Sequence, residues 1–177
     1  MAQQANPTPP TPPGGRGGGG GGRGGTAPPP IQAKPEEVRK IQDKTAQIEA
    51  LVKDLKAKRA KPELLGDVEV YAHAGHMLLE YPDMFANQAA IEHAFSTLDQ
   101  GIERGKQLQA NQPQWNRGRR QIHAYTSEID GAVLPYGVTL PENYDPSKPA
   151  RLYVWLHGRQ NTTVETEFIH GLRLRKP

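Results

Sequence analysis

Residues 151–160, Arg-Leu-Tyr-Val-Trp-Leu-His-Gly-Arg-Gln, are the most informative stretch of this chain for its fold class. The five residues 152–156 are all apolar or aromatic, so they leave no polar side chain for a solvent-facing side. That pattern is typical of a strand covered on both faces, as in a parallel sheet between helices. The run stops at His157-Gly158, where glycine permits a turn that other residues resist. Because ligands of open α/β sheets bind beyond the carboxyl ends of the strands, the stretch predicts a buried strand directed at a ligand site.

A β-hairpin is predicted just before this strand. Residues 121–129 have the composition of a strand, and Asp130-Gly131 is a strong signal for a two-residue hairpin turn. Residues 132–140 then form the returning strand, with apolar residues in alternation. Pro135 cannot donate to a β-ladder, so this strand is expected at a sheet edge or with a bulge. Residues 141–149 are rich in turn formers and connect the hairpin to the buried strand.

Residues 35–112 predict three amphipathic helices. Pro35 and Pro62 suit first helical positions, and Asn87 is a good N-cap for the third helix. Apolar side chains recur every three or four residues along each helix. The stripes consist of Val38, Ile41, Thr45, Ile48, Val52 and Leu55; of Leu64, Val68, Tyr71, Gly75, Leu78 and Leu79; and of Ile91, Ala94, Phe95, Leu98, Ile102 and Gly105. Short connections between such helices predict a small antiparallel bundle or a helical hairpin with a third helix as a cap. The charge-rich faces are interpreted as solvated. The first helix could also serve as a coiled-coil partner surface, although its regular apolar stripe is under four heptads long.

The first 34 residues are almost entirely Pro, Gly, Gln, Thr and Ala. Such a segment cannot bury enough apolar surface to offset its loss of conformational entropy, so we expect it to be disordered. Gly-Arg-Gly sequences around Arg16 and Arg23 are also found in RNA-binding tails, but this segment has two Arg residues and no aromatic residue, which favours a plain linker. The net charge of +3 is too small by itself to indicate nucleic-acid binding.

Metal and thiol chemistry have little support in the sequence. The chain contains no cysteine, which excludes disulfides, thiolate metal sites and a cysteine nucleophile. His73, His76 and Glu80 would share one helix face and could contribute metal ligands. We favour a solvated face instead, because no further ligand cluster is visible, and we expect no metal and no cofactor. His93 and His123 are isolated in the sequence and suggest no role.

The C-terminal part of the sequence resembles a known family. Residues 134–145, Leu-Pro-Tyr-Gly-Val-Thr-Leu-Pro-Glu-Asn-Tyr-Asp, followed by Leu-Tyr-Val-Trp-Leu-His-Gly at 152–158, resemble the opening of an α/β-hydrolase. The likeness is strongest to prolyl-oligopeptidase-like and polyhydroxybutyrate-depolymerase-like esterases. It implies that residues 117–177 are the incomplete start of a hydrolase domain and that residues 35–112 are an accessory helical segment. The fold class expected is therefore an α/β-hydrolase fragment, α+β as present: three helices, a β-hairpin and one buried strand.

The resemblance also implies a site. In the family, the loop after His-Gly supplies a backbone N–H that stabilises the oxyanion of the tetrahedral intermediate. By position the candidates are Gly158, Arg159 and Gln160, and all three stay open because this chain departs from the family where a further glycine is usual. His157 is expected to be structural. No residue of this chain is a catalytic candidate, since none of its serines lies in the Gly-x-Ser-x-Gly turn that positions the nucleophile.

Two functions remain open after this reasoning. The first is an N-terminal fragment of a serine hydrolase, inactive as this chain, whose complete form acts on a small-molecule ester or a peptide. The second is a non-catalytic helical interaction module with a flexible Gly/Arg tail. If the chain is a fragment, residues 152–156 would lack the neighbours that cover a buried strand.

Partners and location are predicted only in part. No apolar run approaches the ~18 residues of a membrane span, so we expect no membrane partner. Met1 is followed by polar residues, which predicts no signal peptide in this chain. Export stays possible if the true start codon lies upstream. The oligomeric state is left open.

Overall fold

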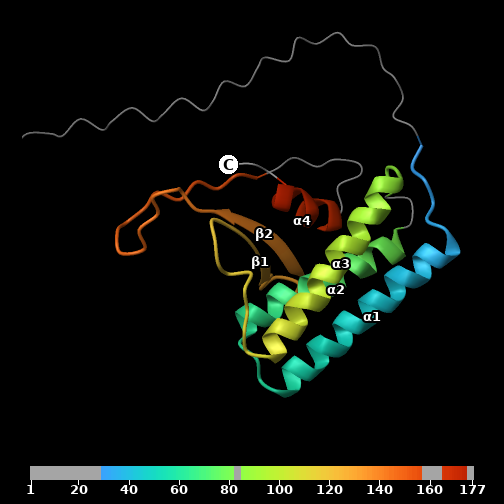
Figure 1. Ribbon diagram of the computed structural model, residues 1–177, viewed down its shortest axis with the longest axis horizontal. Helices are drawn as coiled ribbons and strands as arrows, with labels where there is room; N and C mark the ends of the chain where they lie inside the picture. Colours follow the sequence, from blue (N-terminus) through green and yellow to red (C-terminus); the bar gives the residue numbers. More distant parts are fainter. Residues whose placement is uncertain (1–28, 82–84, 157–164, 175–177) are drawn as a thin grey trace, which may run out of the picture.

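The computed structural model describes residues 29–81, 85–156 and 165–174. In chain order its elements are α1 (Pro35–Ala57), α2 (Pro62–Glu80), α3 (Gln88–Gln109), β1 (Arg120–Thr126), β2 (Val133–Thr139) and α4 (Glu165–Leu174). Helices α1, α2 and α3 pack against one another, the β1–β2 hairpin lies on α2, and α4 packs mainly on α3 (Figure 1). In the described part of the chain, no helix has both the length and the apolar character needed to cross a bilayer.

The three predicted helices are confirmed, together with the signals that begin them. Proline occupies the first turn of both α1 and α2, where its missing N–H costs no helical hydrogen bond. Asn87 caps α3, because its side-chain oxygen accepts a hydrogen bond from the Ala90 N–H at 3.1 Å. The prolines and the Asn87 cap determine where the helices start. The packing of the helices then depends on their apolar stripes.

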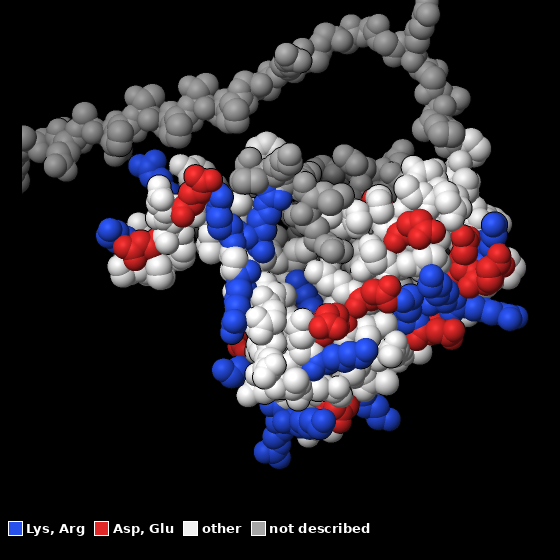
Figure 2. All heavy atoms as spheres, in the orientation of Figure 1, with Lys and Arg blue, Asp and Glu red and all other residues white. Residues whose placement is uncertain are grey.

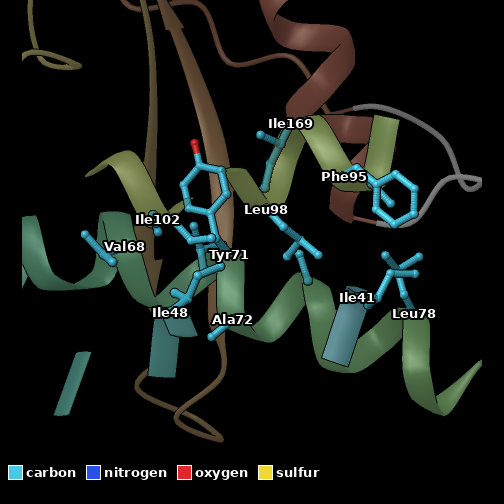
Figure 3. Packing of buried hydrophobic residues seen from close by; sticks show 14 of the residues in the cluster. Ile41, Ile48, Val68, Tyr71, Ala72, Leu78, Phe95, Leu98, Ile102 and Ile169 are labelled. Carbon is cyan, nitrogen blue, oxygen red and sulfur yellow. The ribbon is translucent and has the colours of Figure 1, made fainter. Parts of the chain in front are cut away.

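The stripes of the three helices meet in one core, in which Ile48, Tyr71 and Leu98 are fully buried (Figure 3). The helices approach most closely at glycine. A Cβ atom added to Gly101 would lie 2.5 Å from the Tyr71 Cβ and 2.9 Å from the Ile48 Cδ1, which no side chain could tolerate without a shift. Ile169 of α4 is also fully buried in this core, although no helix was predicted there.

The hairpin is present and antiparallel, with Ile122 opposite Gly137, and Ile122, Ala124 and Val133 join the helical core. The predicted two-residue turn is wrong. The Ser127 N–H donates to the Ala132 carbonyl at 2.8 Å, so residues 128–131 form the loop. A type I′ turn needs positive φ at both central residues, but only Gly131 (φ 74°) has it, not Asp130.

Residues 152–156 differ from the prediction. They form no strand, and their side chains are between 72% and 87% exposed. A doubly covered strand needs a paired strand on its edges and helices over its faces, whereas β1 and β2 pair only with each other in the described sheet. The predicted buried strand is therefore absent from the described part of the chain.

The folded part begins earlier than the predicted boundary at residue 35. Ile31 forms an isolated antiparallel bridge with Phe85, and its N–H donates to the Phe85 carbonyl at 2.8 Å. Phe85 is 2% exposed. Residues 1–28, on which most of the predicted disordered tail falls, lie outside the described residues.

Candidate functional site

The oxyanion-hole candidates Gly158, Arg159 and Gln160 lie outside the described residues, so the structure gives no geometry for them. Two described serine hydroxyls lie near a potential base: Ser147 donates to the Asp145 carboxylate of its own turn at 2.7 Å, and the Ser96 Oγ lies 3.4 Å from the His170 Nδ1. The Ser96 hydroxyl donates to the His93 carbonyl at 3.1 Å. Ser96 is therefore not donating to the neighbouring histidine, as a serine nucleophile activated by histidine would.

The two histidines of α2 lie next to different carboxylates. The His76 Nε2 lies 2.7 Å from the Glu49 carboxylate on α1, and the His73 Nδ1 lies 3.3 Å from the Glu165 carboxylate on α4. Neither shares a partner with Glu80. Within the described ranges, no three His, Asp or Glu side chains are arranged to hold a metal ion.

A buried carboxylate joins the helices to the hairpin. Asp67 of α2 is 2% exposed, and it accepts three hydrogen bonds: from the Trp115 Nε1–H at 2.8 Å, from the His123 Nδ1 at 2.8 Å and from the Ala124 N–H at 2.7 Å. Buried charges are tolerated when they are fully hydrogen-bonded, as this one is. We call Asp67, Trp115, His123 and Ala124 the Asp67 cluster, and it pins β1 to α2.

His123 is not free to act as a base within this cluster. Its Nδ1 faces the Asp67 carboxylate, and its Nε2 lies 2.9 Å from the Gln121 Oε1, so both ring nitrogens are engaged. The Tyr136 ring lies 5.7 Å from the His123 ring. Burial raises the pKa of Tyr136 above its usual value, and the negative charge of Asp67 raises it further. The cluster is therefore suited to holding the hairpin in place rather than to proton transfer.

Arg104 of α3 lies beside the Asp67 cluster and is 3% exposed. One guanidinium nitrogen donates to the Ile122 carbonyl at 2.8 Å and to the Asp67 carbonyl at 3.3 Å. Its Cζ lies 5.1 Å from the centres of both the Tyr71 and the Trp115 rings, within the range of cation–π attraction. The positive charge is thus held in a fixed position where α2, α3 and β1 meet.

A pocket of about 310 Å³ opens between α3 and the hairpin, next to Arg104. It is lined by Gln100, Arg104, Trp115, Arg117, Arg120, Gln121, Ile122, Gly137, Val138 and Thr139. Three of these ten residues are arginines and none is acidic. Lys and Arg side chains also gather on the side of the molecule where Figure 1 places the hairpin and the segment before it (Figure 2). We call this hollow the arginine pocket.

Asp67, Arg104 and His123 were not predicted to be site residues. A signal was available for the first of them, since Asp67 lies three residues after Leu64 and four before Tyr71 and so interrupts an apolar stripe. Arg104 similarly adjoins Gly105 on the buried side of α3. A charged residue on the buried face of a helix is costly unless it has partners, so it marks a place where another element must dock.

Comparisons with protein-family models, with curated proteins and with solved structures found no match to this chain.

Proposed function

We propose that this chain is the N-terminal part of a serine hydrolase whose complete form acts on a small-molecule ester or a peptide. The observation that carries the proposal is the exposure of residues 152–156, five consecutive large apolar side chains that are each 72–87% exposed. A contiguous apolar patch of this kind marks a surface that another element covers.

The energetics favour coverage of these side chains. Burying a Leu, Val or similar side chain stabilises a fold by roughly 1.5–3 kcal/mol, so leaving five of them in water forgoes a large part of a domain's net stability. The β-branched and aromatic residues among them favour an extended strand over a helix. We infer that further strands of the complete protein pair with this run and that helices cover it.

The order of elements supports the same proposal. The hairpin of β1 and β2, the turn-rich residues 141–149 and the apolar run follow one another as in the family that the sequence resembles. In that arrangement Gly158, Arg159 and Gln160 follow the central strand and supply the oxyanion donor, while the nucleophile comes from a later strand. The helical segment then serves as an accessory unit fastened to the hairpin through the Asp67 cluster.

Labelling with a fluorophosphonate, which reacts with activated serines, tests the proposal. The 177-residue chain should not be labelled and should not hydrolyse a p-nitrophenyl ester above a variant in which the backbone at Gly158 is disrupted. A chain extended through the downstream reading frame should be labelled at a serine within Gly-x-Ser-x-Gly. Absence of that motif from all three downstream frames would contradict the proposal.

A second candidate function is a non-catalytic helical interaction module. It is favoured by the core of α1, α2 and α3, which is buried without any contribution from residues 152–156. This module would need no serine downstream, so the labelling experiment separates the two candidates.

A further inference from the structure

We propose that the arginine pocket binds a small anionic ligand through a carboxylate or phosphate group held by Arg104, Arg117 and Arg120. The site is formed by α3, the segment before β1, and the hairpin. Ligand binding there is independent of the proposed hydrolase function. It requires neither the apolar run nor any residue after Thr139.

Charge is the first argument. The pocket walls carry three guanidinium groups and no carboxylate. The nearest buried acid is Asp67, whose carboxylate already accepts three hydrogen bonds within the Asp67 cluster. Setting one Asp67 charge against three arginines leaves two positive charges, so the pocket as a whole attracts an anion.

The partners of the arginines are the second argument. Arg119, which lies between the other two arginines in the sequence, pairs with the Glu142 carboxylate at 2.9 Å. By contrast, Arg117 and Arg120 make no side-chain hydrogen bond or ion pair with any described residue, although both line the pocket. Arginine presents planar donors that match carboxylate and phosphate oxygens in pairs, so two such side chains in the lining of one pocket are suited to an oxyanion.

Preorganisation is the third argument. Two backbone carbonyls and two aromatic rings hold Arg104 in place, so its charge does not have to be ordered when a ligand binds. Its burial also strengthens its attraction for an anion, because the local dielectric constant is below that of water. The Gln100 side-chain oxygen, which is buried and has no hydrogen-bond partner among the described residues, lines the same pocket. The amide of Gln100 is thus available to a polar ligand atom.

The volume of the arginine pocket limits the size of the ligand that it can hold. A volume of about 310 Å³ is at the lower end of the range for small-molecule sites. A nucleic-acid strand would need an extended basic groove with exposed aromatic platforms, whereas this pocket is a single hollow with the half-buried Trp115 as its one aromatic lining residue. The geometry therefore favours a compact anion, with the Trp115 indole as an apolar wall for the rest of the molecule.

Amide NMR titration of the 177-residue chain tests this inference, with inorganic phosphate and succinate as probes at low ionic strength. We expect at least one probe to shift the signals of the Trp115 indole N–H and of the backbone around Arg120. The double variant Arg117→Gln/Arg120→Gln should weaken that binding by at least about tenfold. Phosphate and succinate separate the two ligand chemistries, and a response to either one supports the site.

Matched controls remove the effects of net charge and of unfolding. Arg39→Gln/Lys53→Gln removes two exposed positive charges of α1 that do not line the pocket, and it should leave both titrations unchanged. The amide spectrum of the double variant should retain the dispersed signals of the core, because Arg117 is exposed and Arg120 half-buried. Equal binding by the double variant, shifts no larger than those caused by chloride, or tighter binding of an oligonucleotide than of either probe would each overturn the proposal.

Discussion

Replacing Asp67 by alanine should destabilise the protein more than any other loss of a single carboxylate among its described residues. The change removes the acceptor of three hydrogen bonds, from the Trp115 indole, the His123 ring and the Ala124 backbone. Hydrogen bonds to a charged group contribute about 1.5–3 kcal/mol each, but their losses do not add fully. Trp115 and His123 are only partly buried, so water can reach them once the carboxylate is gone. We therefore expect a loss of about 3–5 kcal/mol, the range found when one partner of a buried charge network is removed.

Urea unfolding followed by far-ultraviolet circular dichroism measures this loss at neutral pH. Asp67→Asn keeps the size of the side chain and one acceptor oxygen, so it should cost less than the alanine variant. Asp43→Ala is the matched control, since Asp43 lies on the exposed face of α1 and makes no hydrogen bond or ion pair among the described residues. The control should stay within about 0.5 kcal/mol of the parent chain. A loss below about 1 kcal/mol for Asp67→Ala would refute the idea that this carboxylate fastens the hairpin to α2.

Three further predictions concern packing, pH and the apolar run. Gly101→Ala should lower the free energy of unfolding by about 1–3 kcal/mol, because the added Cβ would clash with Tyr71. Gly171→Ala on α4 should not destabilise the protein, because nothing lies within 4 Å of the added Cβ, so equal thermal midpoints for the two variants would contradict the prediction. Glu37 accepts hydrogen bonds from the Lys34 N–H and the Gln88 amide, which lower the pKa of its carboxyl. Its contribution to stability should therefore be present at neutral pH and be lost as the pH falls through that lowered pKa, so the stability difference between Glu37→Gln and the parent should vanish in acid. Trp155→Lys should reduce binding of a hydrophobic dye without lowering the free energy of unfolding, since Trp155 is 84% exposed; a clear loss of stability would show that its side chain is packed.

Most of the fold that could be predicted from the sequence followed from the helical periodicity of its apolar residues. The stripes through Ile48, Tyr71 and Leu98 specify which faces meet, and proline and Asn87 specify where helices begin. These signals are local, because a helix forms its own hydrogen bonds and needs only one buried face. The presence of a hairpin was also predictable, but the conformation of its loop was not. The dihedral angles of Asp130 depend on a hydrogen bond that its side chain accepts from the Ala132 N–H.

What the sequence did not predict depends on contacts between distant residues. Asp67 and His123 lie in different segments and come together only when the hairpin docks on α2. Helix α4 buries Ile169 against the bundle, and a short helix of this kind draws its stability from that packing more than from its own sequence. The apolar run has the composition of a buried strand, but composition cannot supply the neighbours that such a strand requires.

Amide hydrogen exchange at residues 152–156 shows whether these residues form a central strand of a larger hydrolase sheet. It should be compared between the 177-residue chain and a chain extended through the downstream reading frame. If this run is a central strand of a larger sheet, its amides exchange rapidly in the 177-residue chain and become strongly protected in the extended one. Equally rapid exchange in both chains would contradict the claim that the run belongs to a hydrolase sheet.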